Sequence, residues 1–69
     1  MPPKESAPDP FEVRRDRLLI RIRNLQHHPS VEGEDLELVD RMASVIQDAR
    51  TTGELTEIEY VLSEVEENL

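Results

Sequence analysis

Apolar residues recur at helical spacing along most of this chain, and that spacing restricts the fold more than any other feature. The clearest run alternates strictly between steps of three and four residues: Leu55, Ile58, Leu62, Val65 and Leu69. Residues at this spacing share one face of an α-helix. No segment alternates with the two-residue period of a strand, so we predict an all-α fold.

The first predicted helix is bounded by a capping residue and a proline. Asp9, Pro10 and Glu12 are typical of a helix start, with Asp9 as the N-cap and Glu12 reaching back to it. Pro29 prevents continuation and disfavours helical geometry at the residue before it. These signals predict a helix over 10–28.

The second and third predicted helices meet near a glycine. Acidic residues begin the second helix, which we place at 34–52 and expect Gly53 to close in the left-handed conformation. Thr56 and Glu59 then match a capping box, so we predict the third helix over 57–67.

Two apolar stripes lie side by side on the second predicted helix. One consists of Leu36, Val39, Ala43 and Ile46, and the other of Leu38, Met42, Val45 and Ala49. Together they cover roughly half of the circumference, more than a simple surface helix requires. We therefore expect this helix to contact both of the others.

Chain length limits the organisation to one small domain. The 69 residues contain no cysteine, so disulfides cannot stabilise the fold. Short connections favour an antiparallel up-down-up three-helix bundle over 9–69, and the proline-rich residues 1–8 predict a flexible tail. No apolar run reaches the roughly 18–20 residues that span a bilayer, and the first ten residues lack the apolar core of a secretory signal. We expect a cytoplasmic protein with no membrane partner.

Positive charge is concentrated in the first helix although the formal net charge is −8. Arg14, Arg17 and Arg21 line one flank of its apolar stripe, and Arg15 and Arg23 line the other. Acidic residues dominate the rest of the chain, so we expect these arginines to pair with carboxylates of the neighbouring helices. Each exposed pair contributes only about 0–1 kcal/mol.

The same arginines allow an alternative function. Arg14, Arg17 and Arg21 are spaced so that they could follow the phosphates of a nucleic acid. The acidic remainder of the molecule would repel DNA, so a DNA-binding module that uses the first helix is the alternative and not the first expectation.

A tyrosine surrounded by acids is the first candidate for a binding site. Tyr60 lies opposite the apolar face of the third helix, near Glu57, Glu64 and Glu67. Aromatic side chains are enriched at the energetic centres of interfaces, and acids steer a basic partner toward them. The competing interpretation is a hydrophobic staple between Leu55 and Tyr60 across the helix start.

A second candidate surface lies on the outer side of the first helix. Val13 and Ile20 are seven residues apart and nearly opposite its apolar stripe. They could meet a partner or a second copy of the chain, which leaves a homodimer open.

Catalytic and metal-binding patterns are missing from the sequence. His27 and His28 are adjacent, so their side chains diverge and cannot share an ion well. The serines 30, 44 and 63 assemble into no recognisable triad with a histidine and an acid. We expect no enzyme activity, no bound metal and no cofactor.

One twelve-residue segment resembles a degenerate EF-hand loop. Its matches to the calcium-loop pattern are Asp48, Gly53, Leu55 and Glu59. Arg50 and Thr52 stand where acidic ligands belong, and a cation in the loop would repel calcium. We expect no calcium binding.

These features favour a small acidic regulator that binds protein without catalysis. Such a chain is suited to a basic surface of a larger protein, where carboxylates can occupy phosphate sites and exclude a nucleic acid. Inhibitors of the transcription machinery encoded by phages and plasmids fit this physics. The alternatives are the DNA-binding module and a structural or chaperone-like helical subunit that shields a partner's amphipathic helix.

Overall fold

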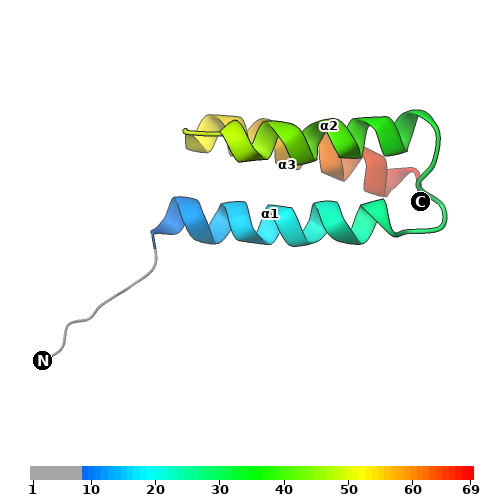
Figure 1. Cartoon of the computed structure of the whole chain (residues 1–69), viewed down its shortest axis with the longest axis horizontal. Helices are drawn as coiled ribbons and strands as arrows, with labels where there is room; N and C mark the ends of the chain where they lie inside the picture. Colours follow the sequence, from blue (N-terminus) through cyan, green and yellow to red (C-terminus); the bar gives the residue numbers. More distant parts are fainter. Residues whose placement is uncertain (1–8) are drawn as a thin grey trace, which may run out of the picture.

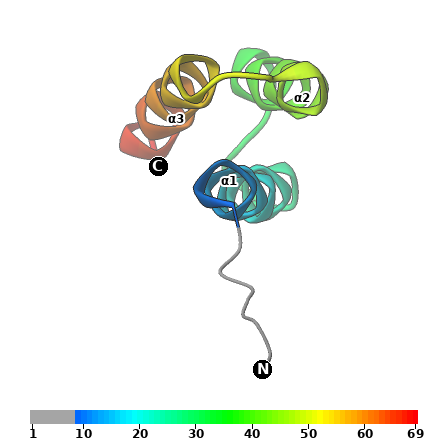
Figure 2. The same cartoon turned by 90° about the vertical axis from the view of Figure 1, so that its left-hand side faces the viewer.

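Three α-helices form the described part of the protein, residues 9–69 of a computed structural model (Figure 1). They are α1 (Pro10–Gln26), α2 (Glu34–Asp48) and α3 (Thr52–Glu67), and these residues contain no strand. The three helices confirm the predicted all-α fold, and successive helices run in opposite directions in Figure 1, as an up-down-up arrangement requires. Seen end-on, they occupy the corners of a triangle, so each helix packs against the other two (Figure 2). The predicted tail, 1–8, lies outside the described residues.

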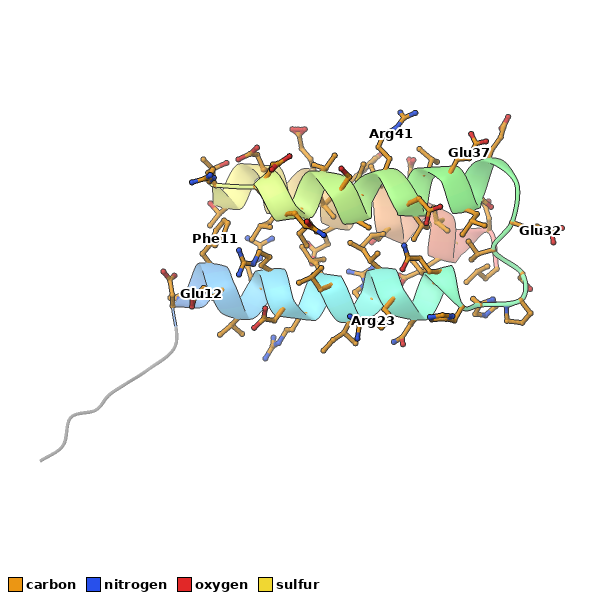
Figure 3. The ribbon with its side chains drawn as sticks, in the orientation of Figure 1. Phe11, Glu12, Arg23, Glu32, Glu37 and Arg41 are labelled. Atoms are coloured by element: carbon orange, nitrogen blue, oxygen red, sulfur yellow. The ribbon has the colours of Figure 1, made fainter. Side chains whose placement is uncertain are left out.

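The core is apolar throughout and draws on all three helices and on both connections between them. Its buried side chains are Leu18, Ile22, Leu25, Val31, Val39, Ile46, Ala49, Leu55, Ile58, Leu62 and Val65. No polar or charged residue within 9–69 is buried. At the start of α1, Phe11 packs against this cluster and lies between α1 and the other helices (Figure 3). Burial of each large aliphatic side chain contributes roughly 1.5–3 kcal/mol.

Helix α1 begins as predicted and ends slightly earlier. The Asp9 carboxylate accepts a hydrogen bond of 2.9 Å from the backbone N–H of Phe11, which confirms the N-cap. Within the described chain Glu12 makes no bond back to Asp9, so the reciprocal half of the predicted cap is absent. The helix ends at Gln26 with His27 as its C-cap, two residues before the predicted end.

Glycine conformation matters at the turn between α1 and α2. Gly33 is the N-cap of α2 with φ of 62° and ψ of −129°, a region that residues with a Cβ rarely adopt. Its carbonyl accepts a 3.1 Å hydrogen bond from the N–H of Glu37. Val31 anchors the same turn, because its side chain is buried in the core.

The boundary between α2 and α3 differs from the prediction. Helix α2 ends at Asp48, and α3 starts at Thr52, five residues before the predicted start. Thr51 is the N-cap: its hydroxyl accepts from the N–H of Glu54 at 3.2 Å, and the Glu54 carboxylate accepts from the N–H of Thr51 at 3.0 Å. Gly53 lies inside the first turn of α3 without a positive φ. The predicted roles of Gly53 as a helix end and Thr56 as a cap are therefore wrong.

Burial of Leu55 explains the earlier start. Leu55 is fully buried in register with Ile58 and Leu62, and a helix that begins at Thr52 places all three side chains on the face toward the core. Thr56 is interior to α3, and its hydroxyl donates to the carbonyl of Thr52 at 3.0 Å. The competing interpretation of Tyr60, a staple with Leu55 across a cap at Thr56, loses its basis because the cap is at Thr51; Tyr60 is 66% exposed.

Candidate partner-binding surface

The interface between α1 and α3 is held by arginine–carboxylate contacts. One edge of the Arg21 guanidinium binds Glu66 through two nitrogens, with Nη2 to Oε1 at 2.6 Å and Nε to Oε2 at 3.3 Å. Arg14 and Arg21 each lie 3.8 Å from a carboxylate oxygen of Glu59. The pairing expected for this flank of α1 is present at two of its three arginines.

Hydroxyl groups of α3 complete the contacts of the same arginines. Arg14 donates to the hydroxyl of Thr56 at 3.3 Å, and Arg21 donates to the hydroxyl of Ser63 at 3.4 Å. Arg17 is exposed beside them, and no carboxylate within 9–69 forms an ion pair with it. Contact with nucleic acid by all three arginines would therefore require the pairs of Arg14 and Arg21 to break.

The opposite flank of α1 faces α2. Arg15 is half-buried, and its Nε atom is buried with no hydrogen-bond partner among residues 9–69. A shallow groove of about 420 Å³ follows this flank, lined by Arg15, Leu19, Arg23, Ile46 and Gln47. Among residues 9–69, no carboxylate forms the expected ion pair with Arg15 or Arg23. The polar contact across α1 and α2 is instead a 3.0 Å hydrogen bond from Gln26 to Asp40.

Helix α3 carries six glutamates and no basic residue. Their positions around the helix separate their roles. Glu59 and Glu66 face α1 and its arginines, and Glu54 serves the N-cap. The three that remain are exposed, and no ion pair in the described chain involves them: Glu57, Glu64 and Glu67.

The carboxylate of Glu54 is tied to the backbone at the start of α3. It accepts hydrogen bonds from the N–H of Arg50 at 2.9 Å and from the N–H of Thr51 at 3.0 Å. These bonds favour the ionised form, so the pKa of Glu54 is lowered, first by the Arg50 backbone and then by the Thr51 hydroxyl and N–H.

Tyr60 lies on the outward face of α3 among the three exposed glutamates. Its side chain is 66% exposed. Residues 57, 60, 64 and 67 follow helical spacing, so they share one face. The structure thus brings together the four α3 residues predicted for partner binding.

The second predicted surface is smaller than expected. Ile20 is 61% exposed on α1, whereas Val13 is half-buried. The pair therefore forms no continuous apolar patch, and it lies on a different helix from Tyr60.

A groove between α2 and α3 went unrecognised in the sequence. It has a volume of about 290 Å³ and is lined by Met42, Val45, Glu54, Glu57, Ile58 and Val61. The signal was the second apolar stripe of the second predicted helix, which we interpreted only as evidence that this helix contacts both of the others. Only its last member, Ala49, is buried, while Leu38 and Val45 are each 37% exposed.

The described residues 9–69 contain neither a candidate metal site nor a membrane-spanning helix. No group of three or more His, Asp or Glu side chains in residues 9–69 is arranged to hold a metal ion. The segment that resembles a calcium loop is helical from Thr52 onward. Of the two adjacent histidines, His28 bonds to the backbone: its imidazole Nδ1 accepts a 3.1 Å hydrogen bond from the N–H of Ser30. No helix in this part of the chain is long and apolar enough to cross a bilayer.

Comparisons with known proteins assign no family to this chain: no protein-family model, curated protein or solved structure matches it. What the protein does must therefore be inferred from its surface chemistry.

Proposed function

We propose that this protein is a non-enzymatic binding module that docks on a basic surface of a larger protein through the outward face of α3. The observation that carries the proposal is the exposed Tyr60 among Glu57, Glu64 and Glu67. These glutamates take no part in the ion pairs of the described bundle. Their charge is available to a partner at no cost to the fold.

The physics of association supports this assignment. An exposed tyrosine offers a large contact area with little conformational entropy to lose, and such residues dominate binding energy in many interfaces. The carboxylates, on a chain of net charge −8, accelerate encounter with a basic partner. Glu57 and Glu67 are about 15 Å apart along the axis at 1.5 Å per residue, which is long enough to meet a row of basic side chains.

The specific form of the proposal is inhibition by charge mimicry. Where the basic surface normally holds nucleic acid, three carboxylates on one helix face would occupy phosphate sites and exclude it. Regulation of a transcription-type machine, of the kind that phages and plasmids target, and a cytoplasmic location belong to this proposal.

One observation favours the second candidate, a helical subunit that shields a partner's amphipathic helix. It is the apolar groove between α2 and α3, which shares Glu57 with the acidic face. The DNA-binding alternative is weaker, because Arg14 and Arg21 are engaged with α3.

Affinity capture from cells of the native host tests the proposal. The parent protein should retain a defined partner, and the complex should weaken as salt concentration rises. The double variant Tyr60→Ala/Glu64→Lys should reduce retention at least about 30-fold, the loss expected for a central interface residue. Circular dichroism should show that this variant keeps the parent's helix content.

A matched control exists on α1. Asp16 and Ile20 are both exposed and have the same four-residue spacing as Tyr60 and Glu64. The control variant Ile20→Ala/Asp16→Lys should bind like the parent. If it loses the partner while Tyr60→Ala/Glu64→Lys retains it, the binding face lies on α1 and the proposal is wrong.

A further inference from the structure

The groove between α2 and α3 has an apolar floor and an acidic edge. Ile58 forms part of the floor and is buried, and Met42, Val45 and Val61 form the apolar walls. Glu54 and Glu57 line the groove from α3. Leu38 lies beyond the groove lining, exposed on the same side of α2 and one helical turn before Met42.

We propose that this groove receives a basic amphipathic helix from the partner protein. The inference rests on the proposed function and deepens it, because it specifies the element of the partner that docks. The apolar face of the partner's helix would cover the exposed side chains of Leu38 and Val45. The lysines or arginines of that helix would meet Glu54 and Glu57 at the edge of the groove.

Charge selects this occupant. Helices α2 and α3 together carry eleven acidic residues against one basic residue, Arg41. Arg41 points away from α1 together with Glu37 (Figure 3). A helix with basic flanks is complementary to this field, whereas an acidic or neutral helix gains nothing from it.

The same field argues against a second copy of this chain in the groove. A symmetric pair would place the same glutamates, 54 and 57, near their counterparts. Like-charge juxtaposition across an interface costs several kcal/mol. The basic helix α1 is no substitute, because Arg14 and Arg21 already bind α3 within their own bundle.

The dimensions also suit a helix. Leu38, Met42 and Val45 follow the spacing i, i+4, i+7, which extends about 10 Å along α2 at 1.5 Å per residue. A docked helix would present its own apolar residues at a matching interval of two turns. Met42 is flexible enough to adapt to side chains of different shape.

A synthetic peptide provides a direct probe. An 18-residue peptide of leucine and lysine, with leucine at i, i+3, i+4 and i+7, has the proposed chemistry. A second peptide of the same composition in scrambled order keeps the charge but loses the apolar face. The first should bind saturably in calorimetry at least tenfold more tightly than the second, and methyl resonances of Leu38, Met42, Val45 and Val61 should shift. Equal affinities, or shifts confined to other residues, would overturn the proposal.

Groove variants separate apolar recognition from charge attraction. Val45→Ser/Val61→Ser leaves every carboxylate in place and should weaken the amphipathic peptide at least tenfold. Ile20→Ser removes a more exposed apolar side chain from α1 and should change affinity less than twofold. Parent-like binding by the groove variant contradicts the proposal. If that variant fails to fold, Val45→Ser alone and the methyl shifts of the parent still decide the question.

Two outcomes distinguish this inference from the proposed function. If the partner captured from the host is lost with Tyr60→Ala/Glu64→Lys but retained with Val45→Ser/Val61→Ser, the groove inference fails and the proposed function stands. If sedimentation shows a dimer that Val45→Ser/Val61→Ser dissociates, a second copy occupies the groove and the inference is wrong.

Discussion

Helix α3 contacts two neighbours, and the two interfaces are built from different chemistry. Toward α1 it presents Glu59 and Glu66, which meet Arg14 and Arg21. Toward α2 the described chain forms no ion pair, and an apolar groove stays open. The difference follows from the signs of charge: α1 is basic, so carboxylates of α3 pair with it, whereas α2 and α3 are both acidic and no arginine or lysine pairs with the carboxylates along their groove in the described residues. The glutamates near α1 therefore stabilise the bundle, and those on the other side are available to a partner.

The largest expected effect tests whether the two sides of α3 are packed alike. Leu62 is fully buried, so Leu62→Ala should lower the free energy of unfolding by about 2–5 kcal/mol. That approaches the whole stability of about 3–5 kcal/mol expected for so small a core. Val61→Ala, at the open groove, should cost about 1 kcal/mol or less. Urea denaturation followed by circular dichroism measures both, and equal losses would mean that the groove is as tightly packed as the core.

Replacing each glycine with alanine compares the start of α2, where Gly33 is the N-cap, with the first turn of α3, which contains Gly53. Gly33→Ala forces a Cβ into a positive-φ conformation and should destabilise the protein by about 1–3 kcal/mol. Gly53→Ala should stabilise it by about 0.4–1 kcal/mol, because Gly53 is helical and an added Cβ meets only ordinary contact. Thermal unfolding gives both signs. A destabilising Gly53→Ala would place the start of α3 after Gly53 and undo the assignment of Thr51 as its cap.

A smaller effect isolates the charge pairing between α1 and α3. Double-mutant analysis of Arg21→Ala and Glu66→Ala should give a coupling energy of about 0.2–1 kcal/mol, as expected for a partly exposed pair. The coupling should shrink in 1 M salt, where charges are screened within about 3 Å. Arg23→Ala and Glu57→Ala share no contact and should be additive. Zero coupling between Arg21 and Glu66 would remove the energetic distinction between the two interfaces.

The subtlest prediction concerns pH at the start of α3. Because the pKa of Glu54 is lowered in the folded state, its stabilisation is full above its ordinary value of 4.5 and is lost as pH falls through the lowered value. The stability difference between the parent and Glu54→Ala should therefore be constant above pH 4.5 and narrow below it. Glu57→Ala, which removes no cap, is the control on the same helix. A difference that does not change in acid would mean that the cap does not depend on the charge.

The number and order of the helices could be predicted because apolar spacing and Pro29 are local signals. The start of α3 could not, because the sequence offers two Thr-x-x-Glu capping boxes, at Thr51 and at Thr56. Both satisfy the motif equally well. Burial of Leu55 against the other helices decides between them, and that is a property of the assembled core.

The candidate binding surface also has one part that the sequence predicted and one part that it did not. The exposure of Tyr60 and its glutamates follows from angles around one helix, so the sequence predicted it. The exposure of Leu38 and Val45 depends on how far α3 covers α2, which all three helices determine together. An apolar stripe in sequence shows that burial is favourable, but not whether this chain or another one supplies the cover.

The contact between Arg21 and Glu66 also bears on the order of folding events. The last turn of α3 contains acids and no basic residue, so its exposed carbonyls and its side chains repel each other electrostatically. Arg21 supplies the missing positive charge from a position 45 residues away in sequence. At 16 residues, α3 is only slightly longer than the roughly 12–15 residues below which an isolated helix is marginal in water, and most helix stability in proteins comes from tertiary packing. We therefore expect the last turn of α3 to depend on docking against α1, and to become helical only after α1 has packed against it.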